Sequence, residues 1–233
     1  MAQIYATFIH ERIPESVFHH LLSCIAPDKR ERICRYRHHE TARQSLAAEI
    51  LVRTLACRML SLHNNQLSFK KNSWGKPYLA GSHDFHFNVS HSNAWVICAV
   101  DSLPVGLDIE LVAPVNLTIA DRFFAAPEVR QLHNLPAEMR LDRFYELWTL
   151  KESYIKSIGK GLSIPLSAFA FHISPDGQIR LVTSLEHEPV YFRQYDLDPR
   201  YKLSVCLRQA VFPDEIVRIP FRELVREFQS YST

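Results

Sequence analysis

The chain has 233 residues, and 47% of them are hydrophobic, which is enough for a packed core in one large domain or two small ones. With 27 lysines and arginines against 25 aspartates and glutamates, the formal net charge of +2 argues against a protein that binds polyanions with its whole surface. The longest apolar stretch, residues 94–100, is too short to span a membrane. Residues 1–5 lack the pattern of a secretory signal, and the five scattered cysteines are typical of free, mostly buried thiols, so we expect a cytoplasmic protein.

The hydrophobic periodicity predicts an α+β protein. The first part is expected to hold a strand near 3–9, short helices near 14–24 and from 28, a longer helix over 40–61, and strands near 67–70, 85–89 and 94–100. The second part is expected to hold a strand over 105–110, helices over 119–132 and 143–158, strands near 168–173, 178–183, 190–195 and 202–207 that close the sheet, and a final helix at 221–229. Both parts run from a helix into strands, a weak internal repeat with a boundary near 101–104.

The strand over 105–110 carries two carboxylates on one face. Asp108 and Glu110 alternate with Leu107 and Ile109, so the acidic and the apolar side chains project to opposite sides. Neighbouring carboxylates repel each other unless a cation lies between them, and Mg²⁺ is commonly shared between one or two carboxylates and substrate phosphates. A magnesium site and a solvated acidic strand face both remain open from this segment alone.

The helix over 143–158 adds a third carboxylate and a lysine. Trp148, Glu152 and Lys156 are spaced by four residues and lie along one helix face. An ordinary surface Glu–Lys pair is the simplest interpretation. Two further lysines lie close by, however: Lys151 beside Glu152, and Lys160 in a Gly-Lys-Gly turn just after the helix. Three carboxylates and these lysines favour a site for Mg²⁺ and a diphosphate, and hence an enzyme of phosphoryl-type transfer.

These motifs, Gly-x-Asp-x-Glu and Trp-x-x-Lys-Glu-x-x-x-Lys, resemble those of the 4′-phosphopantetheinyl transferases. The chain is most similar to the surfactin-type branch, which activates carrier proteins, and the similarity runs from about residue 27 to 213 through the segments 27–32, 74–78, 87–92 and 122–124. The resemblance implies an α+β fold with a pseudo-two-fold pair of similar halves and the active site between them. The N-terminal half, 1–103, would bind the 3′-phosphate of coenzyme A, and the C-terminal half, 104–233, would hold the metal and dock the carrier.

The resemblance also implies which residues contact coenzyme A: Lys29, Arg32, Ser45, Lys76, Ser90, His91 and Lys156. Lys29 and Arg32, one helical turn apart, would bind the 3′-phosphate, and a bidentate arginine suits a phosphate. Lys76 would contact the diphosphate or the adenine side. Relatives often have an acidic residue and an arginine where this chain has Thr41 and Gln44, so that contact is either made by Arg43 or absent.

The reaction implied is transfer of 4′-phosphopantetheine from coenzyme A to a serine hydroxyl of an apo peptidyl or acyl carrier protein, with release of 3′,5′-ADP. Asp108, Glu110 and Glu152 would hold Mg²⁺ against the diphosphate. Glu152, directly or through water, would take the serine proton, with Glu128 as a second candidate, and Lys156 would stabilise or protonate the departing 3′,5′-ADP. The carrier would dock near 157–190, the protein would act as a monomer, and its clients would be nonribosomal peptide synthetases, as in antibiotic biosynthesis.

Two other interpretations compete with this one. A nucleotide- or nucleic-acid-binding module could use the basic segment 29–43, and it would need none of the carboxylates. A magnesium-dependent nucleotide hydrolase would use the carboxylates, but the sequence has no Walker-type glycine-rich loop. We therefore expect no nucleic-acid or membrane partner.

Overall fold

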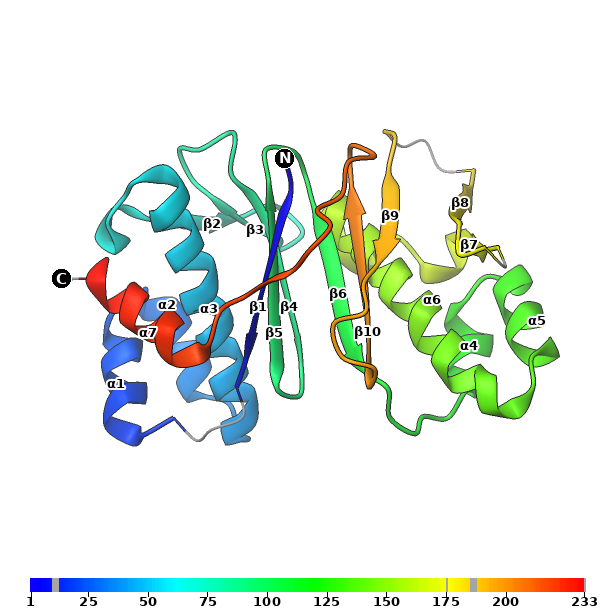
Figure 1. Ribbon diagram of the computed structural model, residues 1–233, viewed down its shortest axis with the longest axis horizontal. Coiled ribbons are helices and arrows are strands. Elements are labelled where there is room, and N and C mark those ends of the chain that lie inside the picture. Colours follow the sequence, from blue (N-terminus) through cyan, green and yellow to red (C-terminus); the bar gives the residue numbers. More distant parts are fainter. Residues whose placement is uncertain (10–12, 175, 185–187, 233) are drawn as a thin grey trace.

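Strands β1 (Gln3–Phe8) and β5 (Trp95–Asp101) are buried on both faces, which explains their nearly continuous apolar sequences. Alternate residues of β5 enter two different cores: Val96 and Cys98 face helices, whereas Ile97 and Ala99 face a second sheet. The computed structural model, which describes residues 1–9, 13–174, 176–184 and 188–232, therefore has four layers in the order helices, sheet, sheet, helices (Figure 1).

The N-terminal half packs its helices on a sheet of order β11-β1-β5-β4. Its elements are α1 (Glu15–Ser23), α2 (Pro27–Cys34), α3 (His39–Leu60), β2 (Phe69–Lys71), β3 (Pro77–Leu79) and β4 (His86–Ser92). The chain returns to this half at its end, because β11 (Val217–Arg218) pairs with β1 and α7 (Phe221–Ser230) packs its buried leucine and phenylalanine into the same core. Residues expected in the C-terminal half thus complete the N-terminal one.

The C-terminal half contains the second sheet, of order β6-β10-β9. Its elements are β6 (Gly106–Leu111), α4 (Thr118–Phe123), α5 (Ala126–Asn134), α6 (Ala137–Ile158), β7 (Phe169–Ile173), β8 (Ile179–Thr183), β9 (Tyr191–Gln194) and β10 (Tyr201–Leu207). The α+β class is confirmed. The prediction that the last four strands of this half all close one sheet was wrong, since β7 and β8 form a separate hairpin.

Two predicted helices have different boundaries. The region 119–132 is two helices, because the chain becomes extended at Phe124 and Ala125 and a proline starts α5. The helix predicted over 143–158 begins six residues earlier, after Pro136, and ends at Gly159 in the left-handed conformation. No helix in the described ranges is both long and apolar enough to cross a bilayer. Of the five free cysteines three are buried, whereas Cys34 is exposed, contrary to the general expectation of buried thiols.

The two halves meet where β4 runs beside β6, and side chains hold this seam together. Alternate side chains of β4 accept hydrogen bonds from backbone N–H groups of β6: Asn88 from Leu107 at 2.8 Å, Ser90 from Ile109 at 3.4 Å, and Ser92 from Leu111 at 3.0 Å. The period of two places all three side chains on the same face of β4. These bonds fix the position of β6, whose Leu107 and Ile109 lie between the sheets.

Because the apolar residues of β6 face the other sheet, its remaining residues face α6. The approach is so close that a Cβ atom on Gly106 would lie 2.0 Å from the carbonyl oxygen of Ser153 and 2.4 Å from the backbone nitrogen of Ser157. Only glycine leaves room for the helix backbone there. Gly106 therefore sets how closely the carboxylates of β6 approach the charged side chains of α6.

We expect Gly106→Ala to destabilise the protein by about 1–3 kcal/mol, because the added methyl group must push α6 away from β6. Denaturant unfolding measures the loss. Gly81→Ala is the comparison, because its Cβ meets nothing within 4 Å and only the positive φ of +81° opposes it. A Gly106→Ala variant no less stable than Gly81→Ala would contradict the close packing of α6 on β6.

Candidate active site

Three adjoining pockets lie along the seam. The basic pocket, about 210 Å³, includes Lys29, Arg32, Ser45 and His91 in its lining. The acidic pocket, about 340 Å³, is lined by Val89, Ser90, His91, Asp108, Glu110, Trp148, Glu152 and Lys156. The tryptophan pocket, about 240 Å³, is lined by Trp74, Gly75, Lys76, Pro77, Asn88, Glu152, Ile155, Lys156, Gly159 and Gly161. Each pair of pockets shares lining residues, and the three pockets together, called the groove below, are lined by every predicted site residue except Glu128.

The acidic pocket confirms that Asp108 and Glu110 share a face of β6 and that Trp148, Glu152 and Lys156 share a face of α6. Asp108 is buried, and its Oδ1 accepts hydrogen bonds from Lys156 Nζ at 2.5 Å and from Ser90 Oγ at 2.9 Å. The other oxygen, Oδ2, is buried and has no hydrogen-bond partner among the described residues. A buried carboxylate oxygen is costly to leave unpaired, so this atom is ready to accept a ligand.

The carboxylates of this pocket disfavour one another's charge. Burial and the neighbouring Asp108 raise the pKa of Glu110 to about 7, although the Ser92 hydroxyl donates to Glu110 at 3.0 Å and opposes the shift. Burial and Asp108 also raise the pKa of Glu152. Burial and the Lys156 ammonium lower the pKa of His91, which favours the neutral ring. The lining of the pocket therefore places three carboxyl groups around the one ammonium of Lys156.

The donor set fits a hard divalent cation, although the side chains are not gathered around a single point. No three Asp, Glu, His or Cys side chains within the described ranges are close enough together to hold a metal ion. Two observations nevertheless fit Mg²⁺. The Oδ2 of Asp108 has no hydrogen-bond partner among the described residues, and burial together with the charge of Asp108 raises the pKa of Glu110 and of Glu152. All three predicted ligands offer carboxylate oxygens, which Mg²⁺ prefers.

We expect the unfolding free energy of the metal-free protein to fall as the pH rises through about 7, partly because Glu110 loses its proton. The folded-state pKa of Glu110 is raised from 4.5 to about 7, so its stabilising contribution is complete below 4.5 and is lost as the carboxylate forms. Glu110→Gln cannot titrate and should show a shallower decline. Denaturant unfolding with a chelator present, between about pH 5 and 8, measures both slopes. Equal slopes would contradict the raised pKa.

The basic pocket brings together residues of α2, α3 and β4. Lys29 Nζ donates to Glu49 at 3.0 Å, so part of its charge is already balanced, whereas Arg32 is exposed. Ser45 lines the pocket from α3, and His91 lines it from β4 and continues into the acidic pocket. The arrangement suits an anion that extends from the basic pocket toward Lys156.

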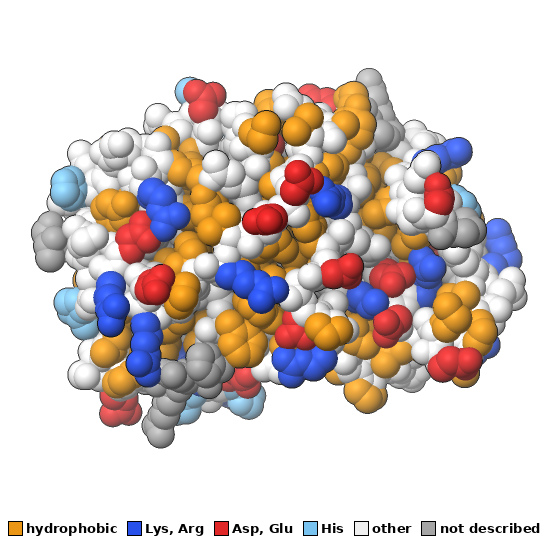
Figure 2. Space-filling model, viewed as in Figure 1, with side chains coloured by type: hydrophobic (Ala, Val, Ile, Leu, Met, Phe, Trp, Pro, Cys, Tyr) orange, Lys and Arg blue, Asp and Glu red, His pale blue; other side chains and the backbone are white. Residues whose placement is uncertain are grey.

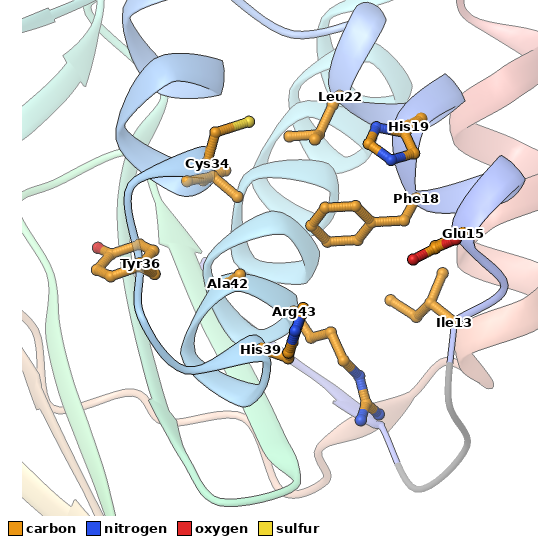
Figure 3. A pocket seen from close by; sticks show the side chains of 11 residues that line it. Ile13, Glu15, Phe18, His19, Leu22, Cys34, Tyr36, His39, Ala42 and Arg43 are labelled. Carbon is orange, nitrogen blue, oxygen red and sulfur yellow. The ribbon is translucent and has the colours of Figure 1, made fainter.

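Of the two alternatives for the missing arginine contact, the structure favours its absence, because neither Arg43 nor Gln44 lines this pocket. Arg43 lines a separate cavity of about 500 Å³ between α1, α2 and the start of α3, where Figure 3 shows it beside His39 at one end. Gln44 donates to the backbone oxygen of Asn93 at 2.5 Å. The contact that relatives are expected to make from these positions is therefore absent from the basic pocket.

Glu128 does not join the acidic pocket. It is 1% exposed and forms an ion pair at 2.7 Å with Lys151, which is fully buried. Its oxygens also accept hydrogen bonds from the backbone nitrogens of Ala125 at 3.0 Å and Phe171 at 2.8 Å. The prediction of Glu128 as a second general base finds no geometric support, because these contacts use its carboxylate within the core of the C-terminal half.

Sequence reasoning gave no role to Ser92, Asn88 or Asn72. Ser92 donates to Glu110, Asn88 lines the tryptophan pocket, and Asn72 hydrogen-bonds the end of α6. The alternating polar residues at 88, 90 and 92, within an otherwise apolar strand, were the signal that could have identified two of them.

The chain matches known proteins along most of its length. Residues 13–103 match the family described as 4′-phosphopantetheinyl transferase, N-terminal, and residues 104–206 match the 4′-phosphopantetheinyl transferase superfamily. The 4′-phosphopantetheinyl transferase Sfp of Bacillus subtilis is 39% identical over 96% of this chain and all of the relative. The 4′-phosphopantetheinyl transferase gsp of Aneurinibacillus migulanus is 34% identical over 98% of this chain and 95% of the relative.

A more distant relative is human. L-aminoadipate-semialdehyde dehydrogenase-phosphopantetheinyl transferase is 30% identical over 79% of this chain and 67% of the relative. The first matched region contains β4 and the second contains β6, so the seam joins the two regions. The chain therefore belongs to the 4′-phosphopantetheinyl transferases, in the Sfp-like branch of that family, and is a transferase that modifies carrier proteins with phosphopantetheine.

Proposed function

We infer that this transferase takes 4′-phosphopantetheine from coenzyme A, passes it to a serine hydroxyl of an apo peptidyl or acyl carrier protein, and releases 3′,5′-ADP in a magnesium-dependent reaction. The observation that carries this proposal is the convergence of Asp108, Glu110, Glu152 and Lys156 on one pocket that opens into the basic pocket. Coenzyme A carries a 3′-phosphate at one end and a diphosphate further along, so it needs two adjoining sites, one for each group.

The basic pocket would hold the adenosine end of coenzyme A. Arg32 and Lys29 would bind the 3′-phosphate, with a further hydrogen bond from the Ser45 hydroxyl. His91 lies between the basic and acidic pockets, where its ring N–H can donate to a phosphate oxygen. Because these contacts are fixed in the N-terminal half, they would orient the diphosphate toward Lys156.

The acidic pocket would carry out the transfer. Magnesium, held by Asp108, Glu110 and Glu152, would neutralise charge on the diphosphate when bound. Glu152, whose pKa is raised by burial and by the charge of Asp108, is suited to accept the serine proton directly or through water. Lys156 would stabilise the negative charge on the leaving 3′,5′-ADP or protonate it. In the structure, Lys156 forms an ion pair with Asp108, with its Nζ 2.5 Å from Oδ1.

The carrier would dock near 157–190, as the resemblance implies. Within this segment Leu166 is buried in the core, whereas Ile164 is half-buried and Pro165 is exposed. The side chain of Leu162 lies outside the described residues. Peptidyl carrier domains of nonribosomal peptide synthetases are the partners that we propose, and a monomer is sufficient because one chain supplies both walls of the groove.

A nucleic-acid-binding module is less well supported. In the basic segment 29–43, Lys29 pairs with Glu49 and Arg35 pairs with Glu31. On the face shown in Figure 2, lysine and arginine side chains are interspersed with acidic and apolar ones. This pattern does not provide the extended basic surface that a phosphate backbone requires.

Intact-mass spectrometry of an apo peptidyl carrier domain tests the proposed function. Incubation with the protein, coenzyme A and Mg²⁺ should add one phosphopantetheine group to the carrier serine, and a chelator should prevent the addition. A carrier in which that serine is replaced by alanine is the control. Unmodified peptidyl and acyl carriers, despite measurable binding of coenzyme A, would refute the proposal.

A further inference from the structure

The turn between β2 and β3 reaches from the N-terminal half to the end of α6. Asn72 closes this turn, because its Oδ1 accepts hydrogen bonds from the backbone nitrogens of Trp74 at 3.0 Å and Lys76 at 2.9 Å. Its Nδ2 donates to the backbone oxygen of Gly159 at 2.8 Å. One side chain therefore shapes the turn and attaches it to the residue that terminates α6.

Lys76 makes the second attachment. Its Nζ donates to the backbone oxygens of Val105 at 3.0 Å and Ser157 at 3.1 Å, both in the C-terminal half. Its stem packs so closely on Gly159 that a Cβ there would lie 2.7 Å from Lys76 Cδ. The last carbonyls of a helix lack intrahelical partners and carry partial negative charge, so an ammonium is well matched to this position.

The two carbonyls belong to the elements that carry the acidic pocket. Val105 immediately precedes β6, which bears Asp108, and Ser157 follows Lys156 on α6. Burial lowers the pKa of Lys76 to about 8, so holding the charged ammonium here has a cost. The close fit of the stem and the two carbonyl acceptors indicate that the buried ammonium, despite this cost, maintains the spacing of β6 and α6.

We propose that Lys76 is a positioning residue, which holds Glu152 and Lys156 opposite Asp108 by tying the end of α6 to the start of β6, and does not bind coenzyme A with its ammonium. This role rests on the proposed function and revises the expectation that Lys76 contacts the substrate. A contact with phosphate would require Nζ to leave both carbonyls and the stem to leave Gly159. The neighbouring Gly75 and Pro77 line the basic pocket, so substrate bound there would lie directly against the turn.

The two roles predict different kinetics. Lys76→Met keeps a stem against Gly159 but removes both hydrogen bonds. We expect kcat for carrier modification to fall about 10- to 100-fold, as for a misplacement of about 1 Å at a reacting centre. The dissociation constant for coenzyme A, measured by calorimetry, should stay within about threefold of wild type, because only catalytic geometry is lost.

Arg32→Met is the matched control for a direct substrate contact. It should weaken coenzyme A binding about 10- to 100-fold, the loss expected for a hydrogen-bonded charge, with a smaller effect on kcat. If Lys76→Met shows this pattern instead, or changes neither constant, the positioning role is overturned. If wild type transfers nothing, the proposed function and the positioning role fail together.

Asn72→Ala keeps the test decisive should Lys76→Met fail to fold. It removes the bond to Gly159 and the two bonds that close the turn but keeps the Lys76 side chain, so kcat should fall about 3- to 10-fold, while the affinity for coenzyme A should stay within about threefold of wild type. All variants are assayed below their measured melting temperatures. Full activity of a folded Asn72→Ala protein would contradict a catalytic role for the attachment of this turn to α6.

Discussion

Replacing Glu152 with glutamine is expected to abolish carrier modification and to leave the fold intact. The amide keeps the size of the side chain but cannot accept the serine proton, and it is a poorer ligand for Mg²⁺. Loss of a positioned general base alone reduces rates about 10²- to 10⁴-fold. Because burial and the charge of Asp108 both raise the pKa of Glu152, replacing this carboxylate with a neutral amide should not destabilise the chain.

Transfer to an apo carrier, followed by intact mass, measures the rate, and thermal unfolding verifies the fold. Glu138→Gln, an exposed glutamate in the first turn of the same helix, is the matched control and should retain wild-type activity. Full activity of Glu152→Gln would remove Glu152 from the mechanism and would leave the binding of phosphates as the main role of the groove.

Replacing Lys151 with methionine is expected to lower the free energy of unfolding by about 3–5 kcal/mol, the usual cost of breaking a buried ion pair on one side. Lys151 is fully buried and donates to Glu128 and to the backbone oxygens of Leu166 and Phe169 at 2.7–2.8 Å. All three acceptors would lose their partner. Burial raises the pKa of Glu128 and Lys151 opposes that shift, so the variant loses the cation that stabilises the buried carboxylate.

Urea unfolding measures the loss. Glu128→Gln added to Lys151→Met removes the uncompensated charge and keeps an oxygen that can accept from Ala125 and Phe171, so the double variant should recover part of the stability. A loss below about 1 kcal/mol in Lys151→Met would contradict a buried pair and would match a solvated one instead.

The local chemistry of the site could be predicted from periodicity, because it depends on neighbours within one element. A period of two placed Asp108 and Glu110 on one face of a strand, and a spacing of four placed Glu152 and Lys156 on one face of a helix. The adjacent Lys151 could not be placed in the same way. Its burial depends on Glu128 and on carbonyls more than ten residues distant in sequence, which periodicity does not reveal.

The fold prediction also failed where the structure depends on contacts between residues that are distant in sequence or on a local break in an otherwise regular pattern. Strands β1 and β5 were identified from continuous apolar runs, but the pairing of β11 with β1 joins residues at opposite ends of the chain. The break between α4 and α5 depends on two extended residues, Phe124 and Ala125, that interrupt an otherwise helical pattern. The role of Lys76 depends on carbonyls from two other elements, so no property of its own segment distinguishes a substrate contact from a positioning contact.

The seam between β4 and β6 divides the constraints on sequence unequally between the two strands. In the three hydrogen bonds that run from the β6 backbone to β4 side chains, β6 contributes N–H groups, which every amino acid except proline provides, whereas β4 must contribute an oxygen at Asn88, Ser90 and Ser92. For these three bonds, residue identity is therefore specified in β4 alone. The facing strand is left free to select its alternate side chains for chemistry, and it places Asp108 and Glu110 there.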